Sequence, residues 1–354
     1  MLNDYKGLKL IASSNPHIRT NEDTRSIMLD VIIALCPALL MSVLRFGFRA
    51  LISVLVSVVS AMFFEWLYRK LLHKTQTIGD LSAAVTGVLL AFVCPVTLPY
   101  WMLIVGNFFA IFVVKQLYGG LGKNFLNPAL AGRAALVACY TSQMTSWIDP
   151  ASGKAPLFGG ADVVTAATPL AMMKGGEFAE VTAQYSLSDM FIGNIGGSLG
   201  EISAMMLLIG GLYLIFRKVI SWQIPVAYIG TVAVLTFLFP QGNDAMSWML
   251  YNVLGGGLFL GAFFMATDYS TSPVTAPGRI IYGVGCGALT VLIRVFGGFP
   301  EGVSFAILIM NCCAWMFDKH TQRRQFGVSR EDVKAKKAAA KAAKKEAKEA
   351  AANG

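Results

Sequence analysis

The sequence contains few charged residues and lacks the patterns that mark common hydrolytic or metal-dependent enzymes. Charged side chains make up 14% of the 354 residues, whereas soluble domains carry about a quarter. The three histidines are scattered, the six cysteines form no CxxC pair, and neither an HExxH nor a Ser-His-Asp pattern is present. We therefore expect no metal site and no hydrolytic site, and we interpret the cysteines as small apolar side chains.

Positive charge is in excess, but it is concentrated at one end of the chain. The formal net charge is +9. After Phe317 the sequence has eleven Lys or Arg residues and five acidic residues. A basic tail that follows a membrane span indicates membrane topology and contact with anionic lipid. Membrane lipid is therefore an expected partner, and nucleic acid is not.

Apolar residues are abundant and fall into segments that approach membrane-spanning length. The hydrophobic fraction is 55%, and the mean hydropathy is +0.60. Residues 1–25 are polar, so no cleavable signal peptide is expected. The fold class that follows is an all-α polytopic membrane protein with about ten transmembrane helices. The predicted spans are 26–44, 50–68, 79–94, 98–117, 125–141, 199–216, 223–239, 247–267, 279–296 and 302–317.

The predicted spans divide the chain into two halves around one long connection. The side that holds both termini carries 23 Lys or Arg residues, and the opposite side carries 5. This bias predicts that both termini are cytoplasmic and that the long connection faces outward. The predicted organisation is a cytoplasmic N-terminal tail (1–25), a first five-helix repeat (26–141), an outer loop (142–198), a second five-helix repeat (199–317) and a basic cytoplasmic C-terminal tail (318–354).

A short motif recurs in the two halves at a constant spacing. Cys94–Pro99 reads CPVTLP and Ser272–Pro277 reads SPVTAP, an offset of 178 residues that also carries Gly119-Gly120 onto Gly297-Gly298. Each half has an odd number of predicted spans, so a duplication would invert the second half in the membrane. Inverted repeats favour a site near the membrane midplane. Alternatively, the prolines only end helices at loops.

The outer loop contains a threonine beside small residues. Asp162–Thr168 reads DVVTAAT, and Pro169 follows. Pro169 disfavours the helical conformation at Thr168, and the neighbouring alanines leave space beside its hydroxyl. Taken alone, the motif is typical of a Thr-Pro turn before an amphipathic stretch.

The motif resembles the Asp-x-x-Ser/Thr-x-Ala-Thr flavinylation motif of two related families. These are RnfD, a membrane component of the Rnf ion-translocating electron transport complex, and NqrB, its counterpart in the sodium-pumping NADH:quinone reductase. The segments Ser14–Arg19 (SNPHIR), Asn127–Arg133 (NPALAGR) and Met265–Asp268 (MATD) extend the resemblance to nearly the whole chain. The opening segment and the Pro169-Leu170 continuation are more similar to the Rnf family, although Asn15 departs from its usual Ser.

The resemblance implies a covalent cofactor in the outer loop. FMN would be attached through its phosphate to Thr168, with Asp162, Thr165 and Ala167 as the other motif positions. Attachment would need a separate flavin transferase, because nothing in this sequence encodes that activity. The resemblance also leaves room for a second, noncovalent flavin, whose position the sequence does not indicate.

The resemblance further implies a component of a redox-driven translocase in the bacterial inner membrane. Other membrane and peripheral subunits would be its partners, and electrons would pass between ferredoxin and NAD, coupled to sodium or proton transport. This chain alone would hold no complete active site, and the catalytic residues of ion transfer remain unidentified. Two alternatives are the NqrB component of the reductase and a channel or secondary transporter without a redox group.

Two charged residues are candidates for a role inside the membrane. Arg133 lies within a predicted span, where a charge is costly. It would meet an oxygen of a flavin or quinone, or it would form a structural pair with an acid on another span. Asp268 adjoins the second copy of the repeated motif. We expect Asp268 to lie near the membrane interface, together with Asp80, Glu65 and Lys115.

Overall fold

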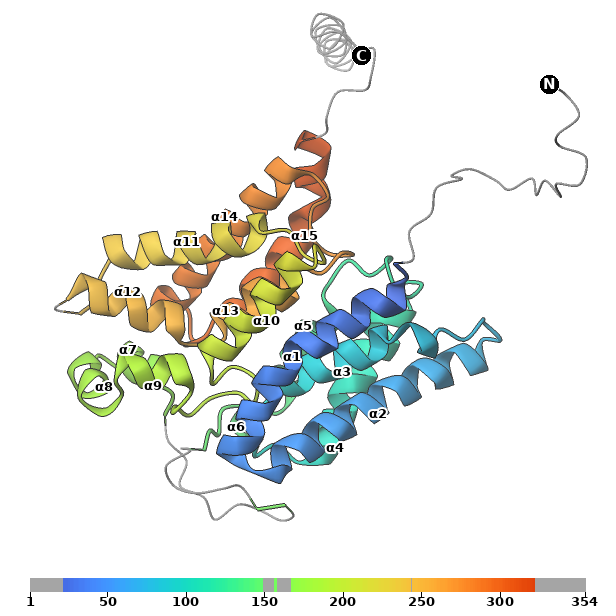
Figure 1. The fold of residues 1–354 in the computed structure, drawn as a ribbon, viewed down its shortest axis with the longest axis horizontal. Coiled ribbons are helices and arrows are strands. Elements are labelled where there is room, and N and C mark those ends of the chain that lie inside the picture. The colour runs from blue at the N-terminus through green and yellow to red at the C-terminus, as the bar shows by residue number, and fades with distance from the viewer. Residues whose placement is uncertain (1–21, 149–155, 158–166, 243, 322–354) are drawn as a thin grey trace, which may run out of the picture.

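The computed structural model describes residues 22–148, 156–157, 167–242 and 244–321. These residues form helices joined by turns, and Figure 1 shows two groups of helices, one blue to teal and the other yellow to red. The first group comprises α1 (Thr24–Phe46), α2 (Phe48–Leu71), the 3₁₀ turn η1 (Ile78–Asp80), α3 (Ser82–Phe92), α4 (Tyr100–Asn107), its π-helical continuation η2 (Phe108–Gln116) and α5 (Pro128–Cys139).

Short helices connect the first group to the second. They are α6 (Thr141–Met144), α7 (Pro169–Lys174), α8 (Phe178–Gln184) and α9 (Leu187–Ile192). The second group comprises α10 (Ala204–Phe216), α11 (Gln223–Leu238), α12 (Ala245–Leu254), α13 (Leu258–Leu260), the π-helical η4 (Gly261–Met265), α14 (Ala276–Phe296) and α15 (Val303–Thr321). In Figure 1 the start of α1 and the end of α15 lie toward the top, whereas α7–α9 lie toward the bottom beside α10 and α12.

Several of the described helices have the length and composition of membrane spans. The helices α1, α2 and α14 are each long and apolar enough to cross a membrane, and α12 with residues 258–265 passes the same test as a pair bent by 58°. Five further apolar helices have only 10–17 residues: Ser82–Phe92, Tyr100–Gln116, Pro128–Cys139, Ala204–Phe216 and Gln223–Leu238. The described helices are consistent with a polytopic membrane protein. The number of ten spans and the inverted repeat stay predictions.

The outer surfaces of the long helices are apolar. Leu44 and Phe48 are 63% and 70% exposed, and Phe216 and Phe296 are 86% and 82% exposed. Large side chains of this kind, repeated over several helices, would form an unfavourable surface in water. A lipid environment accounts for them without any further partner.

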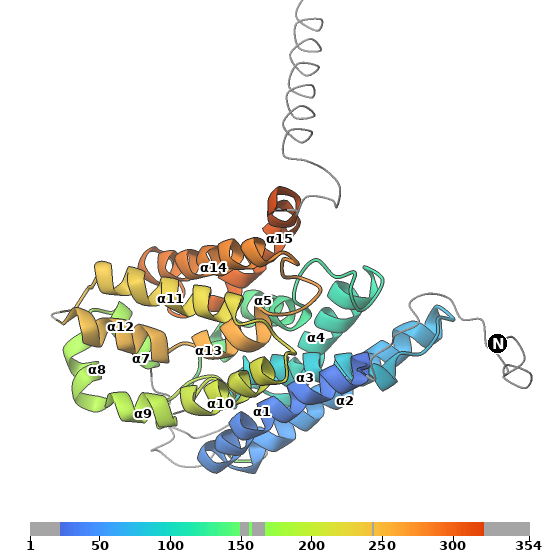
Figure 2. The same cartoon turned by 45° about the horizontal axis from the view of Figure 1, so that its top comes forward.

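Small residues let the two groups approach each other closely. Helices α1 and α10 contact along much of their length (Figure 2). At this contact a Cβ built on Gly210 would overlap the Ala34 carbonyl oxygen. Only glycine fits there, and such small-residue contacts are typical of packed membrane helices.

The predicted span 247–267 is broken rather than continuous. Gly256 and Gly257 have φ angles of 67° and 66°, in the left-handed region that favours glycine. A Cβ on Gly257 would also overlap the carboxyl group of Glu201. The glycine run therefore ends α12 and brings the backbone close to an acidic side chain.

Both copies of the repeated PVTxP motif lie where helices end or begin. The first copy is the turn between α3 and α4, and Arg49 donates hydrogen bonds to the carbonyls of Val96 at 2.8 Å and Thr97 at 3.0 Å. The second copy begins α14, and the Asp318 carboxylate accepts from the Val274 and Thr275 N–H groups at 2.9 and 3.1 Å. The two copies of the motif therefore lie at helix boundaries, as expected if the prolines only end helices at loops.

Candidate functional site

Thr168 lies immediately before α7, and its side chain caps that helix. Pro169 is the first helical residue, and Thr168 Oγ1 accepts a hydrogen bond from the Ala171 N–H at 3.2 Å. Thr followed by Pro is a favourable helix start, because the hydroxyl satisfies a free N–H and proline lacks one. Thr168 is only 6% exposed. The chain therefore holds this hydroxyl in a defined position.

Contacts to the second group of helices fix the segment that carries Thr168. Lys174, at the end of α7, donates to the backbone carbonyls of Gly297 and Phe299. The Tyr251 hydroxyl of α12 donates to the Tyr185 carbonyl at 2.5 Å. These bonds connect α7 and the α8–α9 turn to α12 and the turn after α14.

A reciprocal cap begins α9 in the same segment. The Ser186 hydroxyl accepts from the Asp189 N–H at 3.2 Å, and the Asp189 carboxylate accepts from the Ser186 N–H at 3.2 Å. Hydrogen bonds from the Ser186 hydroxyl and the Asn194 amide lower the pKa of Asp189, because they favour the charged carboxylate. This cap stabilises the start of α9.

A cavity of about 310 Å³ lies beside Thr168. This volume is at the lower end of the range for small-molecule and cofactor sites, about 300–1,000 Å³. The rings of Phe299 and Phe305 stack in its wall with centroids 4.9 Å apart. Flat aromatic surfaces suit a flat aromatic ligand. The apolar lining comprises Ala134, Val137, Met144, Trp147, Ala167, Ala171, Phe299, Pro300 and Phe305.

A charged pair from the two groups of helices lies in the wall of this cavity. One terminal nitrogen of the Arg133 guanidinium, on α5, donates a hydrogen bond to the Glu301 carboxylate. The other terminal nitrogen donates to the Ser304 hydroxyl. The three residues are 8%, 9% and 4% exposed. The Arg133 Nε is buried and has no hydrogen-bond partner within the described part of the chain. A buried donor without an acceptor costs about 1–3 kcal/mol.

Further charged groups surround the same region. Arg294 of α14 donates to the backbone carbonyls of Glu301 at 3.0 Å, Asn252 at 2.5 Å and Gly255 at 3.2 Å. Glu201 lines a small hollow of about 20 Å³ together with Thr168 and Glu301. Thr168 therefore lies between an aromatic cavity and a smaller acidic one, with Glu301 bordering both.

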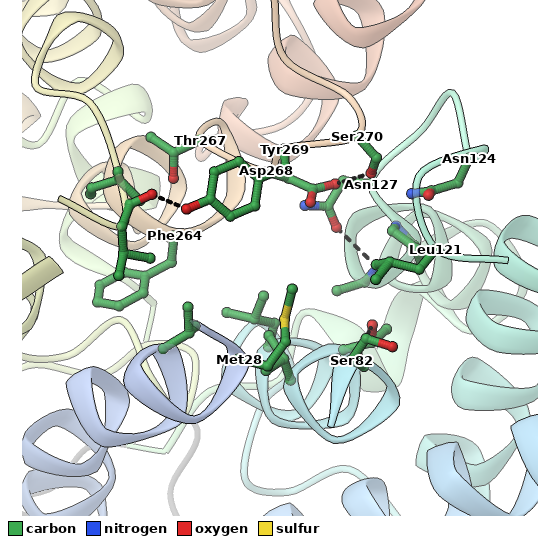
Figure 3. Close-up of a pocket in the computed structure, with 18 of the residues that line it drawn as sticks. Met28, Ser82, Leu121, Asn124, Asn127, Phe264, Thr267, Asp268, Tyr269 and Ser270 are labelled. Atoms are coloured by element: carbon green, nitrogen blue, oxygen red, sulfur yellow. Dashed lines mark hydrogen bonds between the residues drawn. The ribbon is translucent and has the colours of Figure 1, made fainter. Parts of the chain in front are cut away.

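A second cavity, of about 80 Å³, lies between the two groups of helices at a distinct place (Figure 3). Ser82, Lys115 and Asn127 line it from the first group, and Asp268 and Ser270 line it from the second. The Asp268 carboxylate accepts from the Ser270 hydroxyl at 2.9 Å. The lining is mixed, with polar groups on both sides of an otherwise apolar space.

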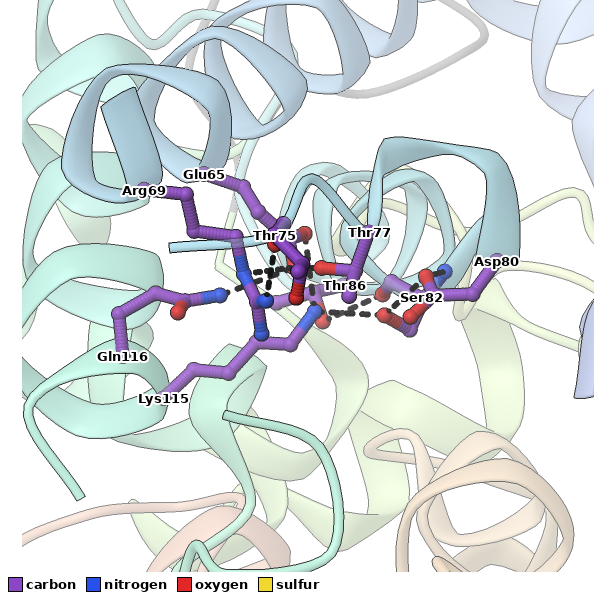
Figure 4. A network of polar contacts seen from close by, with 9 residues as sticks. All are labelled: Glu65, Arg69, Thr75, Thr77, Asp80, Ser82, Thr86, Lys115 and Gln116. Carbon is purple, nitrogen blue, oxygen red and sulfur yellow. Dashed lines mark hydrogen bonds and ion pairs between the residues drawn. The ribbon is translucent and has the colours of Figure 1, made fainter. Parts of the chain in front are cut away.

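A buried ion pair adjoins the second cavity (Figure 4). Lys115 Nζ donates to Glu65 Oε2 at 3.1 Å and to Ser82 Oγ at 2.6 Å, and Gln116 and Thr77 donate to Glu65 Oε1 at 2.9 and 2.8 Å. The Glu65 and Lys115 side chains are 1% and 2% exposed. The folded chain therefore encloses both charges, and their position near the membrane interface stays a prediction.

Comparison with known proteins identifies the family. Residues 11–327 match the NQR2, RnfD, RnfE family. The chain belongs to this family. It is 48% identical over 331 residues to the D subunit of the Na(+)-translocating ferredoxin:NAD(+) oxidoreductase complex of Acetobacterium woodii, covering 93% of this chain and 99% of the relative.

Two further relatives of this chain are also named as D subunits of ion-translocating oxidoreductase complexes. The D subunit of the proton-translocating ferredoxin:NAD(+) oxidoreductase complex of Clostridium ljungdahlii is 42% identical over 324 residues, which cover 90% of this chain and 96% of the relative. The D subunit of the ion-translocating oxidoreductase complex of Actinobacillus succinogenes is 35% identical over 348 residues, which cover 89% and 97%. The family expected from the sequence motifs is therefore confirmed.

The predicted site residues of this family member fall in different places. Thr168, Ala167 and Arg133 line the aromatic cavity together. Asp268 lies in the second cavity and does not join them. Asp162 and Thr165 lie outside the described residues. The structure thus brings together three of the predicted residues and separates one.

Sequence reasoning missed the partners of Arg133. Its partners Glu301 and Ser304 were not named as site residues, and neither was Arg294, which donates to the Glu301 carbonyl. Their common signal was position, since each lies at the outer end of a predicted span near the turn after α14. The sequence alone did not show that this turn meets α5.

Proposed function

We propose that this chain is the RnfD component of an Rnf-type complex that passes electrons between ferredoxin and NAD and couples this flow to sodium or proton transport. The proposal is supported by relatives with names of that kind that align over nearly the full length of both chains. Their names differ in the transported ion, so the ion is left open. The other subunits of the complex would be the partners of this chain, and the complex as a whole would be the enzyme.

The chain's own contribution would be to hold FMN at Thr168. The observation that supports this is the buried Thr168 hydroxyl at the wall of an aromatic cavity of about 310 Å³. Thr168 would carry the phosphate, the apolar wall would receive the flavin ring and exclude water, and Arg133 would supply positive charge. When bound, the flavin would supply the redox chemistry, accepting and releasing electrons. A flavin transferase would have to attach it.

Replacement of Thr168 tests this assignment. In the full-length protein co-expressed with a flavin transferase, Thr168→Ala should abolish covalent flavin, because the attacking oxygen is lost. In-gel flavin fluorescence and the intact mass of the peptide that contains residue 168 would report the attachment. Thr182→Ala is the matched control, because Thr182 is an exposed threonine of α8 in the same segment. Covalent flavin that persists in Thr168→Ala would disprove the site.

A second, noncovalent flavin is part of the proposal. The cavity in Figure 3 is a candidate place for it, since polar and apolar groups from both groups of helices meet there. At about 80 Å³ the cavity must widen before a flavin ring can enter. Flavin that is released by acid from Thr168→Ala would support this second site, and a protein without such flavin would argue against it.

The proposed topology has two inverted five-helix repeats, with both termini in the cytoplasm and the Thr168 segment on the outer face of the bacterial inner membrane. Each group of helices has a comparable series of elements, and the 178-residue offset carries the PVTxP turn before α4 onto the turn that begins α14. The C-terminal tail would associate with anionic lipid through its Lys and Arg residues.

Two rival functions make different predictions. An NqrB component of a sodium-pumping NADH:quinone reductase would co-purify with partners that reduce quinone and lack ferredoxin-type subunits. A channel or secondary transporter without a redox group would show no flavin absorbance after purification.

A further inference from the structure

The positive charge of Arg133 is placed where a flavin at Thr168 would be sensitive to it. Arg133 and Thr168 line the same cavity, which has an otherwise mainly apolar wall. In surroundings of low polarity a charge acts more strongly than in water. The arrangement therefore gives Arg133 an electrostatic effect on whatever occupies the cavity.

The partners of Arg133 satisfy only part of its guanidinium group. Its terminal nitrogens bind Glu301 and Ser304, but the buried Nε has no partner within the described part of the chain. A guanidinium whose only role was to connect α5 to α15 would be expected to satisfy its donors, because buried donors usually have acceptors. The incomplete pairing indicates a role beyond connection.

We propose that Arg133 raises the reduction potential of the flavin bound at Thr168 and that Glu301 moderates this effect as its counter-charge. The proposal rests on the function proposed above. A flavin that takes up two electrons and one proton gains one negative charge, and charge near its ring tunes its electronics. The electrons come from redox groups of the partner subunits. A nearby guanidinium stabilises the added negative charge, whereas a nearby carboxylate opposes it.

Because Glu301 carries the opposite charge to Arg133, the proposal predicts that removing each side chain's charge shifts the flavin reduction potential in opposite directions. Glu301 borders the same cavity and holds Arg133 from the other group of helices. Removal of the guanidinium should lower the flavin potential, and removal of the carboxylate should raise it. A purely structural pair predicts that both variants loosen the site and shift the potential in the same direction or not at all.

The test is a redox titration of the covalent flavin in full-length protein. Arg133→Met should lower the midpoint potential by about 30 mV or more, which is a tenfold change in the equilibrium constant of a two-electron couple. Glu301→Gln should raise it. Arg133→Lys keeps a positive charge and should lower the potential less than Arg133→Met. Lys123→Met removes an exposed positive charge elsewhere and should leave the potential unchanged.

Several results would overturn the proposal. They are an unchanged potential in Arg133→Met with flavin still attached, shifts of the same sign in Arg133→Met and Glu301→Gln, or equal shifts in the Lys and Met variants. If Arg133→Met does not fold, Glu301→Gln and Arg133→Lys still decide the question. The redox titration of Thr168→Ala measures any noncovalent flavin, and this signal is subtracted from that of the other proteins. Wild-type protein without covalent flavin at Thr168 would instead show, before any titration, that the proposed function had failed.

Discussion

Two buried ion pairs join distant parts of the chain, Arg133 with Glu301 and Glu65 with Lys115. Arg133 was identified from its position inside an apolar segment, because any charge there needs a reason. Its partner Glu301 was not identified, since a sequence does not show which acid meets which base at a separation of 168 residues. Thr168 was found through a motif, and its burial at 6% could not have been deduced from that motif.

The Glu65–Lys115 pair gives a prediction at this scale. Lys115→Met should destabilise the protein by about 3 kcal/mol, the lower end of the range for breaking a buried pair, because it removes the nearer cation of the buried Glu65 carboxylate and leaves Arg69 at 3.8 Å as its counter-charge. The double variant Glu65→Leu/Lys115→Met should be less destabilised, because it removes both charges. The midpoint of thermal unfolding in detergent measures both effects. Lys123→Met, at an exposed lysine, is the control and should leave the midpoint nearly unchanged. A double variant less stable than Lys115→Met would contradict this account.

At the scale of helices, hydrophobic patterning located the elements well and described their interruptions poorly. The predicted span 79–94 corresponds to α3 and 125–141 to α5, each trimmed by a few residues at both ends. The span 247–267 contains a break at residues 255–257 that was read as part of a helix. Glycine serves both as a helix breaker and as a packing residue in membrane helices, so its presence alone does not separate the two roles.

Helix packing gives a second prediction. Gly210→Ala should destabilise the protein by about 1–3 kcal/mol, because the added methyl group would overlap the Ala34 carbonyl oxygen of α1. Gly230→Ala in α11 is the matched control, since nothing lies within 4 Å of its added Cβ. Alanine also has the higher helix propensity, so this variant should be neutral or slightly stabilising. Thermal unfolding of the two variants in detergent compares them, and equal midpoints would show that the α1–α10 contact is not tight.

For the whole molecule, composition, charge distribution and motifs were sufficient to predict the class of protein and its family. They were insufficient to define how the two groups of helices are joined. Asp30 of α1 accepts from Tyr213 at 2.9 Å and from Arg217 at 3.0 Å, and Asn127 donates to the Met265 carbonyl at 3.2 Å. These contacts depend on the relative placement of distant helices, which local patterns do not encode.

The proposed topology gives a prediction at this largest scale. A membrane-impermeant thiol reagent added to intact cells should label Gln241→Cys, in the exposed turn between α11 and α12, and should not label Lys74→Cys, after α2. Permeabilised cells should label both. Each signal is compared with that of the unaltered chain, which has six cysteines of its own. The reverse pattern would place the termini outside and would overturn the assignment of the Thr168 segment to the outer face.

The wall of the aromatic cavity has a consequence for how the protein can change over evolutionary time. Its two sides are encoded far apart, by α5 and the turn after α6 on one side and by residues 299–305 on the other. Substitutions in contact do not act independently. A mutation that enlarges one side therefore alters which mutations the other side tolerates. Lineages of this protein should accumulate paired changes across these two stretches of the gene, while Thr168 stays fixed between them.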